Sequence, residues 1–438
     1  MHPACRILLS LPVFFSWVFL CNAAGQGRDS TAQSAPLVRF GYQQRIRIET
    51  TDNAVGLSKD ARKGTSYLRN RTSVWARIVP ATSLAVDVRF TNECRYYFVP
   101  ETRAFDEDEI AVDQLYLTWD KPARLPLTLK LGRQNIHLGE GFVVMDGAPL
   151  AGSRLLYFNA VRADWSFSPS RRLTLAYTYQ SERDKILPVL GDKKRPLAEQ
   201  PEEGIMAYYA TDFFAGGAQA YFIRKNTYAL ESRPGTVHVN CPGVRFDYPV
   251  TRGLSLVGEA AAQFGSWSGN TMRAFGGYGY SRYVVGGKGF IPRSATLGGI
   301  YLSGDDPTTT DHEGWDPLFS RFPKWSESYI YALIPEHSVA YWSNFVSLYA
   351  GLSFDVAPEL TFSIDYHWLL APRAPEAGRS FPGGTGKTRG DLYIATLSYK
   401  PSKTLNGRVV LDHFKPGDFY FDGANPYTWM LMEVLVNL

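Results

Sequence analysis

Hydrophobic and polar residues alternate along much of the chain, and the clearest stretch runs from Pro426 to Leu438. Successive side chains of a β-strand point to opposite faces, so a period of two indicates a strand with one apolar face. This strand stops where the chain ends, and its backbone donors and acceptors need a partner. In lipid, a barrel that pairs its last strand with its first supplies that partner. The pattern therefore predicts a transmembrane antiparallel β-barrel.

Short turn signals divide the rest of the chain into hairpins. Nine hairpins predict about eighteen strands, with about sixteen as the alternative count. Longer polar or Gly/Pro-rich loops join the strands within each hairpin, and the longest is expected over 305–340. Short turns on one side and long loops on the other are typical of bacterial barrels whose turns face the periplasm. We expect the turns at 80–82, 121–123, 169–171, 212–214, 249–251, 288–290, 357–359 and 401–403.

The N-terminus carries a secretory pattern. A basic start, Met1 to Arg6, precedes an apolar run from Ile7 to Leu20 and then small residues. The run is shorter than the roughly 20 residues of a bilayer-spanning helix, so we predict a signal peptide over 1–24. A short periplasmic segment, 25–36, and a single barrel domain, 37–438, are expected to follow. Such a leader favours the membrane barrel over a soluble propeller or sandwich, whose strands alternate in the same way.

The composition agrees with this class. The chain has 438 residues, of which 45% are hydrophobic, yet its mean hydropathy is -0.19. No stretch after the leader approaches 18 continuous apolar residues, which excludes helical membrane spans. A barrel escapes such scans because its lipid-facing and lumen-facing residues average out. The net charge of +4 is too small to indicate nucleic acid, and we expect no nucleic-acid partner.

Basic side chains gather on one face of the first predicted strands. Arg45 and Arg47 alternate with Ile46 and Ile48. An arginine in lipid costs roughly 2–4 kcal/mol at the midplane, so the arginine face must be the lumen. The same phase in the following strands extends a charged wall. We predict that the pore is lined by Arg45, Arg47, Glu49, Arg69, Arg71, Arg77, Asp87, Arg89, Glu93, Arg95, Lys130, Arg133, Arg162 and Asp164.

Two interpretations of this wall stay open. A basic stripe inside a water-filled barrel attracts anions and lowers the barrier for carboxylates. Alternatively, the arginines pair with lumenal carboxylates such as Asp87 and Glu93, brace the wall and leave the pore closed or neutral. The first interpretation predicts an anion-selective channel whose interspersed acidic groups keep binding weak enough for release.

Several motifs resemble those of the alginate-export family of outer-membrane barrels. Leu131-Gly132-Arg133-Gln134 is followed by Leu138-Gly139-Glu140-Gly141, and later by related patches at 152–154 and 158–162. The opening strand with Arg45-Ile46-Arg47 matches the family's arginine-rich start. The segments 303–306 and 315–319 look like its Ser-Gly-Asp strand end and Asp-Pro-Leu-Phe loop. The resemblance covers most of the chain after the leader, although no patch is as specific as a catalytic signature.

The resemblance implies an eighteen-stranded barrel in the bacterial outer membrane, with an electropositive pore that exports an acidic polysaccharide of the alginate type. Small organic anions are the alternative cargo, and a structural or adhesive barrel that acts through its outer loops is the competing class. We expect a monomer in contact with lipid and lipopolysaccharide, with periplasmic export machinery as a candidate partner and no cofactor. Because the predicted turns are short, a gate is expected in the outer loop 305–340 rather than from below.

Three residues carry individual expectations. Strict alternation from Leu125 to Leu131 points Arg133 at lipid, so we expect a bulge at Gly132 that turns Arg133 into the lumen. Cys94 shares the parity of lipid-facing residues, and we expect it and Cys241 to lie too far apart for a disulfide.

Catalysis and metal binding are weaker hypotheses. His367 shares a lumenal face with Asp365, but the sequence contains no Gly-x-Ser-x-Gly elbow, so we expect no enzyme. The acidic residues between Asp305 and Asp316 make calcium an alternative for the long loop, although such loops are usually only solvated. We expect no bound metal.

Overall fold

A computed structural model describes most of the chain after residue 36. The described ranges are 37–53, 57, 64–101, 106–145, 157–194, 196–198, 200–320, 343–375 and 383–438, with the backbone alone for 106–108. The predicted signal peptide (1–24) and the segment 25–36 lie outside the described residues. Within the described ranges, no helix is long and apolar enough to cross a membrane.

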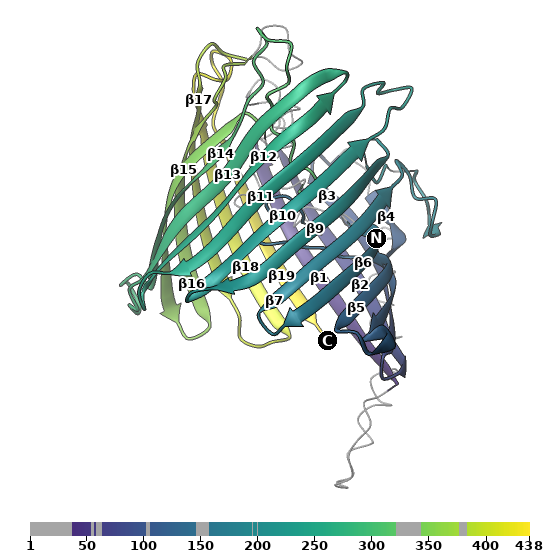
Figure 1. Ribbon diagram of the computed structural model, residues 1–438. Coiled ribbons are helices and arrows are strands. Elements are labelled where there is room, and N and C mark those ends of the chain that lie inside the picture. The colour runs from purple at the N-terminus through teal and green to yellow at the C-terminus, as the bar shows by residue number, and fades with distance from the viewer. Residues whose placement is uncertain are drawn as a thin grey trace. The chain divides into compact units, whose positions relative to one another are not determined.

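Antiparallel strands dominate the described chain (Figure 1). Except for β8, which has two residues, they form the wall of a barrel. The strands are β1 (Val38–Asp52), β2 (Thr65–Ala81), β3 (Leu84–Val99), β4 (Asp106–Asp120), β5 (Leu127–Gln134), β6 (Phe158–Ser168), β7 (Arg171–Gln180), β8 (Val189–Leu190), β9 (Glu202–Phe213), β10 (Gly216–Thr227), β11 (Val237–Pro249), β12 (Leu254–Trp267), β13 (Asn270–Val284), β14 (Ser294–Leu302), β15 (Phe345–Ala357), β16 (Leu360–Leu370), β17 (Thr388–Tyr399), β18 (Leu405–Pro416) and β19 (Tyr427–Asn437).

The sheet closes on itself through its first and last strands. β1 pairs with β2 on one side and with β19 on the other, in a register that runs from Gln43↔Asn437 to Asp52↔Thr428. β7 pairs with β9, while β8 adds only to β4. The wall therefore has 18 of the 19 strands in the sheet. The prediction of an all-β transmembrane barrel of about eighteen strands is confirmed.

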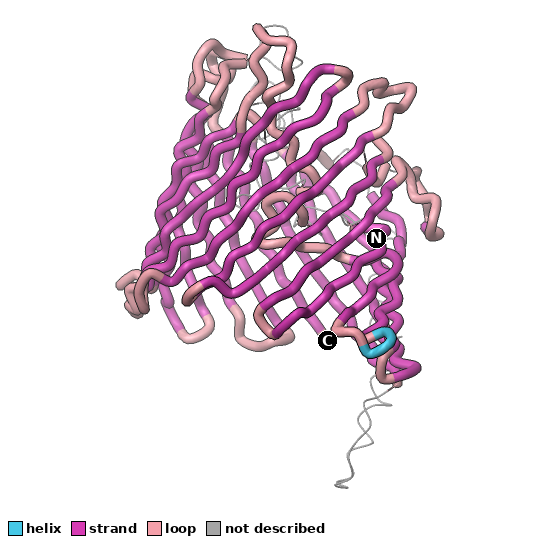
Figure 2. Tube along the Cα trace, viewed as in Figure 1, coloured by secondary structure: helices cyan, strands magenta, loops and turns pink. Residues whose placement is uncertain are grey.

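The connections divide into two kinds, as the sequence predicts. All eight expected turn positions fall between the strand pairs that the short connections join, from β2–β3 to β17–β18. The β4–β5 turn holds a short 3₁₀ helix, η2 (Pro122–Arg124). Figure 2 shows the short connections on one rim and the longer loops on the other. We call these the turn side and the loop side.

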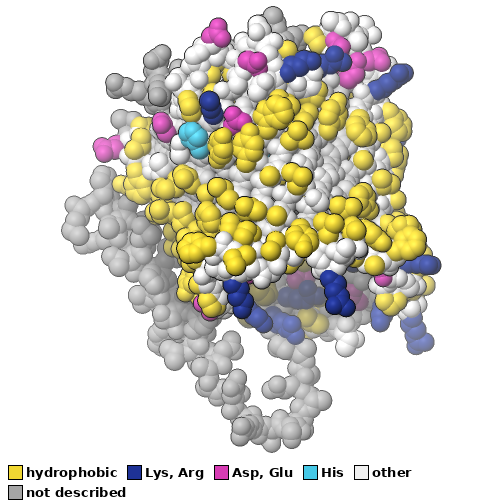
Figure 3. Space-filling view, turned by 90° about the vertical axis from the view of Figure 1, so that its left-hand side faces the viewer, with side chains coloured by type: hydrophobic (Ala, Val, Ile, Leu, Met, Phe, Trp, Pro, Cys, Tyr) yellow, Lys and Arg dark blue, Asp and Glu magenta, His cyan; other side chains and the backbone are white. Residues whose placement is uncertain are grey.

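The two faces of the wall differ in chemistry. Side chains such as Phe40 (73% exposed), Val161 (52%) and Phe264 (50%) point outward, and hydrophobic atoms form a broad belt on the outer surface (Figure 3). The opposite positions carry the buried polar and charged residues, including Arg47 and Glu93. The cysteines Cys94 and Cys241 are both free, as expected. The alternation in the sequence thus separates a lipid face from a lumenal face.

Neighbouring residues of β14 test this assignment. Leu297 is 66% exposed on the outer face, whereas Thr296 pairs with Arg282 on the lumenal face. We expect Leu297→Arg to lower the free energy of unfolding in lipid vesicles by about 2–4 kcal/mol, because it places a guanidinium against acyl chains. The matched Thr296→Arg variant should lose less than half as much. Equal losses in urea titrations would contradict the assignment of faces.

Candidate functional site

The predicted arginine wall lies on the lumenal face of β1, β2 and β3. The register sets basic residues directly opposite each other: Arg45 faces Arg71, and Arg69 lies between Arg47 on β1 and Arg95 on β3. Like charges at directly opposed positions destabilise a sheet. The wall therefore needs counter-charges, and the structure supplies some of them.

Glu93 is the centre of one set of ion pairs. Its Oε1 accepts a hydrogen bond from Arg69 Nε at 2.6 Å and lies 3.3 Å from Arg95 Nη2. Its Oε2 lies 3.3 Å from Arg45 Nη2. The side chains of Glu93 and Arg69 are 0% exposed. This part of the wall is a packed ionic cluster.

Glu433 on β19 extends the cluster across the seam of the barrel. It accepts hydrogen bonds from Arg47 Nε at 2.8 Å and from Arg408 Nε at 2.7 Å. Arg47 Nη1 also lies 3.5 Å from Glu49 Oε1. Arg47 is 1% exposed, so it holds the two ends of the chain together rather than facing open water.

The cluster keeps an excess of positive charge. Arg71 is half-buried, and its Nε and Nη1 are buried without a hydrogen-bond partner in the described chain. An unpaired buried donor costs free energy. The cluster consists of six arginines and three glutamates: Arg45, Arg47, Arg69, Arg71, Arg95 and Arg408 with Glu49, Glu93 and Glu433.

Other predicted residues form separate pairs nearer the turn side. Arg77 Nη1 lies 3.4 Å from Asp87 Oδ1, and Arg162 Nε lies 2.9 Å from Asp164 Oδ2. Lys130 is directly opposite Arg162 in the register of β5 and β6. These residues share the lumenal face but do not belong to the ionic cluster.

Arg89 has a partner that the sequence analysis missed. Its Nη2 lies 2.8 Å from Oδ2 of Asp113, a fully buried residue of β4. The register of β3 and β4 shifts between Arg89 and Phe90, so a simple count of alternate residues does not place Asp113. The bulge explains why this carboxylate had no predicted role.

Arg133 differs from the expectation. β5 pairs with both neighbours without a register shift through Gly132, which takes a φ of 122° instead of forming a bulge. The Arg133 guanidinium is held by Asp184 of the β7–β9 loop at 2.7 and 2.8 Å, and it lies over the Tyr157 ring. Burial raises the pKa of the Asp184 carboxyl, but the hydrogen bonds and charge of Arg133 outweigh it, so this pKa lies below its ordinary value.

Two segments of loop-side connections fold into the barrel. They are 135–145, which follows β5, and 303–320, which follows β14. Val144 and Phe319 form a parallel bridge, and Ser320 Oγ donates to the carbonyl of Gly141 at 2.6 Å. We call this joined pair of segments the inner plug. The expected gate in 305–340 is described only up to residue 320, and the contribution of 135–145 was not predicted.

One ion pair fixes the second segment to the wall. Lys225 Nζ on β10 lies 3.2 Å from Asp316 Oδ1 and donates to the carbonyl of Leu318 at 2.9 Å. The Gln263 side chain on β12 donates to the Asp316 carbonyl at 2.6 Å and accepts from the Asp316 amide at 2.9 Å. Side chains of the barrel wall thus form hydrogen bonds with the Asp316 backbone and an ion pair with its carboxylate.

A second ion pair fixes the Leu138–Gly141 motif. Glu140 Oε1 lies 3.4 Å from Arg245 Nη2 and accepts a hydrogen bond from Tyr280 Oη at 2.8 Å. Gly139 has a φ of 57°, and a Cβ there would lie 3.0 Å from Tyr208 Oη. The glycine is needed because the backbone approaches the wall closely with positive φ.

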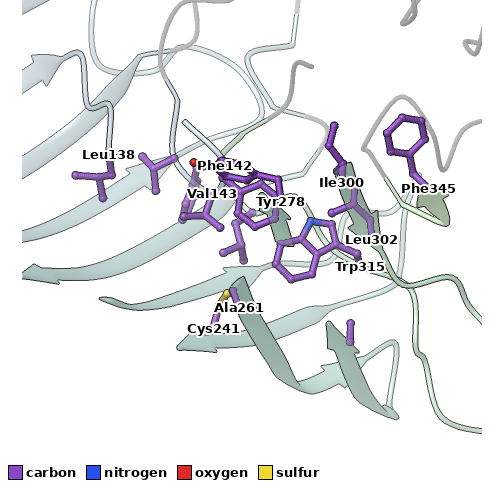
Figure 4. Packing of buried hydrophobic residues seen from close by; sticks show 14 of the residues in the cluster. Leu138, Phe142, Val143, Cys241, Ala261, Tyr278, Ile300, Leu302, Trp315 and Phe345 are labelled. Atoms are coloured by element: carbon purple, nitrogen blue, oxygen red, sulfur yellow. The ribbon is translucent and has the colours of Figure 1, made fainter. Parts of the chain in front are cut away.

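Wall glycines make room for aromatic residues of the plug. A Cβ at Gly204 would lie 2.4 Å from the Phe319 ring, and one at Gly276 would lie 2.7 Å from the Trp315 ring. Trp315 stacks on Phe142 with ring centroids 5.3 Å apart (Figure 4). These contacts lie on β9 to β13, which are opposite the arginine-rich strands in the strand order. One side of the lumen is filled and the other side is charged.

The histidine and the loop carboxylates that the sequence analysis singled out make contacts with other protein side chains. Ser347 Oγ and His367 Nδ1 are 3.0 Å apart, Ser347 is 0% exposed, and His367 stacks on Tyr349. Among the acidic loop residues, Asp305 contacts His312, with 3.2 Å between Oδ1 and Nδ1. Burial lowers the pKa of His312, and the charge of Asp305 opposes this shift.

The other loop carboxylates also have protein partners. Asp306 Oδ2 lies 2.8 Å from Arg373 Nη1, and Asp311 Oδ2 lies 3.9 Å from Arg273 Nε. The described residues contain no group of three or more His, Cys, Asp or Glu side chains arranged to hold a metal ion. Nothing in this part of the chain favours the calcium alternative.

The buried thiol of Cys241 can report how often the inner plug opens. Cys241 is fully buried on β11, beside Gln263, with 4.0 Å between Sγ and Nε2. Asp316→Asn removes one charge of a buried pair, which costs about 3–5 kcal/mol when the other charge remains. We therefore expect a water-soluble maleimide to modify Cys241 at least about tenfold faster, because the plug opens locally more often. Asp311→Asn, in an exposed pair of the same loop, is the control and should leave the rate unchanged.

The fold has relatives among solved structures. Acinetobacter baumannii OccAB1 superposes with a TM-score of 0.61 at 12% identity, over 92% of this chain and 97% of that one. Pseudomonas aeruginosa OccK2 (OpdF), solved in complex with glucuronate, gives 0.59 at 12% identity, over 92% and 98%. Pseudomonas aeruginosa OpdK, solved with vanillate, gives 0.57 at 10% identity, over 91% and 98%. At these identities the likeness shows the fold alone.

Sequence comparison, rather than the shared fold, shows the family of this chain. No curated protein sequence matches the chain. The family model for alginate export matches residues 37–428, nearly the whole of the barrel. A closed barrel with an apolar outer belt and short turns on one rim is the architecture of bacterial outer-membrane channels. The chain is an outer-membrane β-barrel that belongs to the alginate export family.

Proposed function

We propose that this protein is an anion-selective channel that passes carboxylate-bearing glycans, with an acidic polysaccharide of the alginate type as its cargo. The ionic cluster provides the selectivity. Its more exposed members, Arg71, Arg95 and Arg408, would contact the passing carboxylates. Arg47 and Arg69, which are almost fully buried, would hold the cluster in place together with its glutamates.

The observation that carries this proposal is the charge excess beside Arg71. Directly opposed arginines repel each other, and the glutamates of the cluster are too few to neutralise them. The buried Nε and Nη1 of Arg71 have no acceptor in the described chain. A carboxylate of the cargo would supply that acceptor while it passes, and nearby Glu93 would keep the binding weak enough for release.

The inner plug supports a second cargo class. Because the plug fills the lumen beside β9 to β13, the open path is narrower than the barrel itself. OccK2, which shares the fold, was solved in complex with glucuronate, a single carboxylate-bearing sugar. Small organic anions therefore remain the alternative cargo, and they would use the same arginines. We further propose that the barrel works as a monomer in lipid and lipopolysaccharide, with periplasmic export machinery delivering a polymer.

Selectivity in a planar bilayer tests the proposal. We expect the wild-type channel to prefer chloride over potassium in a salt gradient. Arg71→Gln should lower the permeability ratio by a factor of about two to five, because it removes a charge that no glutamate of the cluster fully pairs. Arg71 is a cleaner target than Arg45 or Arg47, whose removal would break an ion pair with Glu93 or Glu433.

The control and the cargo are tested in the same recordings. Arg224→Gln removes an exposed charge on the outer face of β10 and should leave the permeability ratio unchanged. Alginate oligomers of increasing length should block the current at decreasing concentrations if a polymer is the cargo. Block that is independent of length would favour small organic anions. Cation preference in the wild type, or no conductance at all, would refute the channel mechanism and leave the adhesive alternative.

A further inference from the structure

A second group of basic residues lies at the turn side of the lumen, apart from the ionic cluster. Arg39 is the second residue of β1, Arg77 is near the end of β2, and Arg172 is the second residue of β7. Lys130 and Arg162 lie between them on β5 and β6. We call these five residues the turn-side arc. β1 to β7 are consecutive in the wall, so the arc spans roughly 29 Å at about 4.8 Å per strand.

The residues of the arc point into the mouth of the barrel. Arg39 is directly opposite Arg77, on the face that continues to Arg45. Arg172 is opposite Ser166 on β6, which places it on the same face as Arg162. This face is the lumenal one, so the side chains project into water rather than toward lipid headgroups. Arg171, the neighbour of Arg172, lies on the opposite face with the lipid-exposed Leu175.

Two charges of the arc are exposed and have no ion-pair partner among the described residues. Arg39 and Arg172 are exposed, and neither has an ion-pair partner in the described chain. Arg39 faces Arg77, and Lys130 faces Arg162, so two like-charge pairs are in direct opposition. The acidic residues on the same part of the mouth are Asp87, Asp120, Asp164 and, at the end of β9, Asp212. Asp87 pairs with Arg77, Asp164 pairs with Arg162, and Asp120 accepts a hydrogen bond from Thr128.

The loop side lacks a comparable excess in its described part. Its basic and acidic residues alternate and pair, as Arg373 does with Asp306 and Arg273 with Asp311. On the face that Figure 3 shows, Lys and Arg outnumber Asp and Glu along the lower edge of the apolar belt, and both signs mix along the upper edge. A field of one sign at one mouth raises the local concentration of a counter-charged polymer there.

We infer that the turn-side arc is a capture site for a polyanion, separate from the selective cluster deeper in the lumen. This inference rests on the proposed function, because it names where the anionic glycan first binds. Several weakly held carboxylates spread over the arc bind through multivalency, so a polymer gains more than a single sugar acid does. A polymer bound there lies at the periplasmic entrance with its end free to enter the cluster.

Sided block in a planar bilayer tests the capture site. The orientation of each channel is fixed with a biotin attached in the β17–β18 turn of a Ser402→Cys, Cys94→Ser variant and streptavidin added to one chamber. We expect an alginate oligomer of fixed length to reach half-block at about tenfold lower concentration from the turn side than from the loop side. Arg39→Gln with Arg172→Gln should reduce this difference to less than about twofold.

Matched variants separate the capture site from general charge effects. Arg171→Gln removes an adjacent charge on the outer face and should retain the full difference between sides. Arg39→Lys with Arg172→Lys keeps the charge and should also retain it. Equal block from both sides by a channel that still prefers chloride would overturn the capture site alone. Loss of sidedness in Arg171→Gln would also overturn it, since the effect would then come from charge at the lipid rim. Absence of chloride preference in the wild type would instead overturn the proposed function.

Discussion

Pairing of β1 with β19 is the constraint on which the structure depends. In lipid, an unpaired strand edge has no water to satisfy its amides and carbonyls, so the sheet must close. The register that closes it also fixes which residues face the lumen. A slip of one residue would exchange Arg45 and Arg47 for Ile46 and Ile48 and place guanidinium groups in the acyl chains. One strand register therefore determines both the closure of the barrel and the side chains that face the lumen.

Closure of the barrel in this register places arginines of β1 and β2 opposite each other, and the ionic cluster offsets part of their repulsion. Opposed arginines weaken the pairing of β1 with β2, and Glu93 and Glu433 offset much of that repulsion. Full neutralisation would make a more stable wall without affinity for anions. The structure keeps an excess, with Arg71 as its least satisfied member. The bracing interpretation describes the paired members of the cluster, and the anion selectivity that we propose would use its less satisfied members.

The inner plug and the cluster divide the lumen between them. The plug is held by Lys225 and Arg245 and seated over wall glycines such as Gly204 and Gly276. The strands that contact the plug lie on the opposite side of the barrel wall from β1, β2 and β3. An anion that crosses the barrel would then run between an aromatic, largely uncharged surface and a basic one. That geometry favours an extended chain or a small solute over a bulky one.

The sequence by itself determined the barrel, the two faces and the positions of the turns. Alternation and turn residues are local signals, so one strand at a time suffices to read them. It also determined that Arg45, Arg69 and Glu93 share a face. Only the tertiary structure decided which charges meet, because contacts such as Arg47 with Glu433 join residues at opposite ends of the chain. The same holds for Arg133, which binds Asp184 without a bulge, for Asp113 behind a register shift, and for the plug. Loop segments that fold inward have no periodic signal, and their partners are set by the closed wall around them.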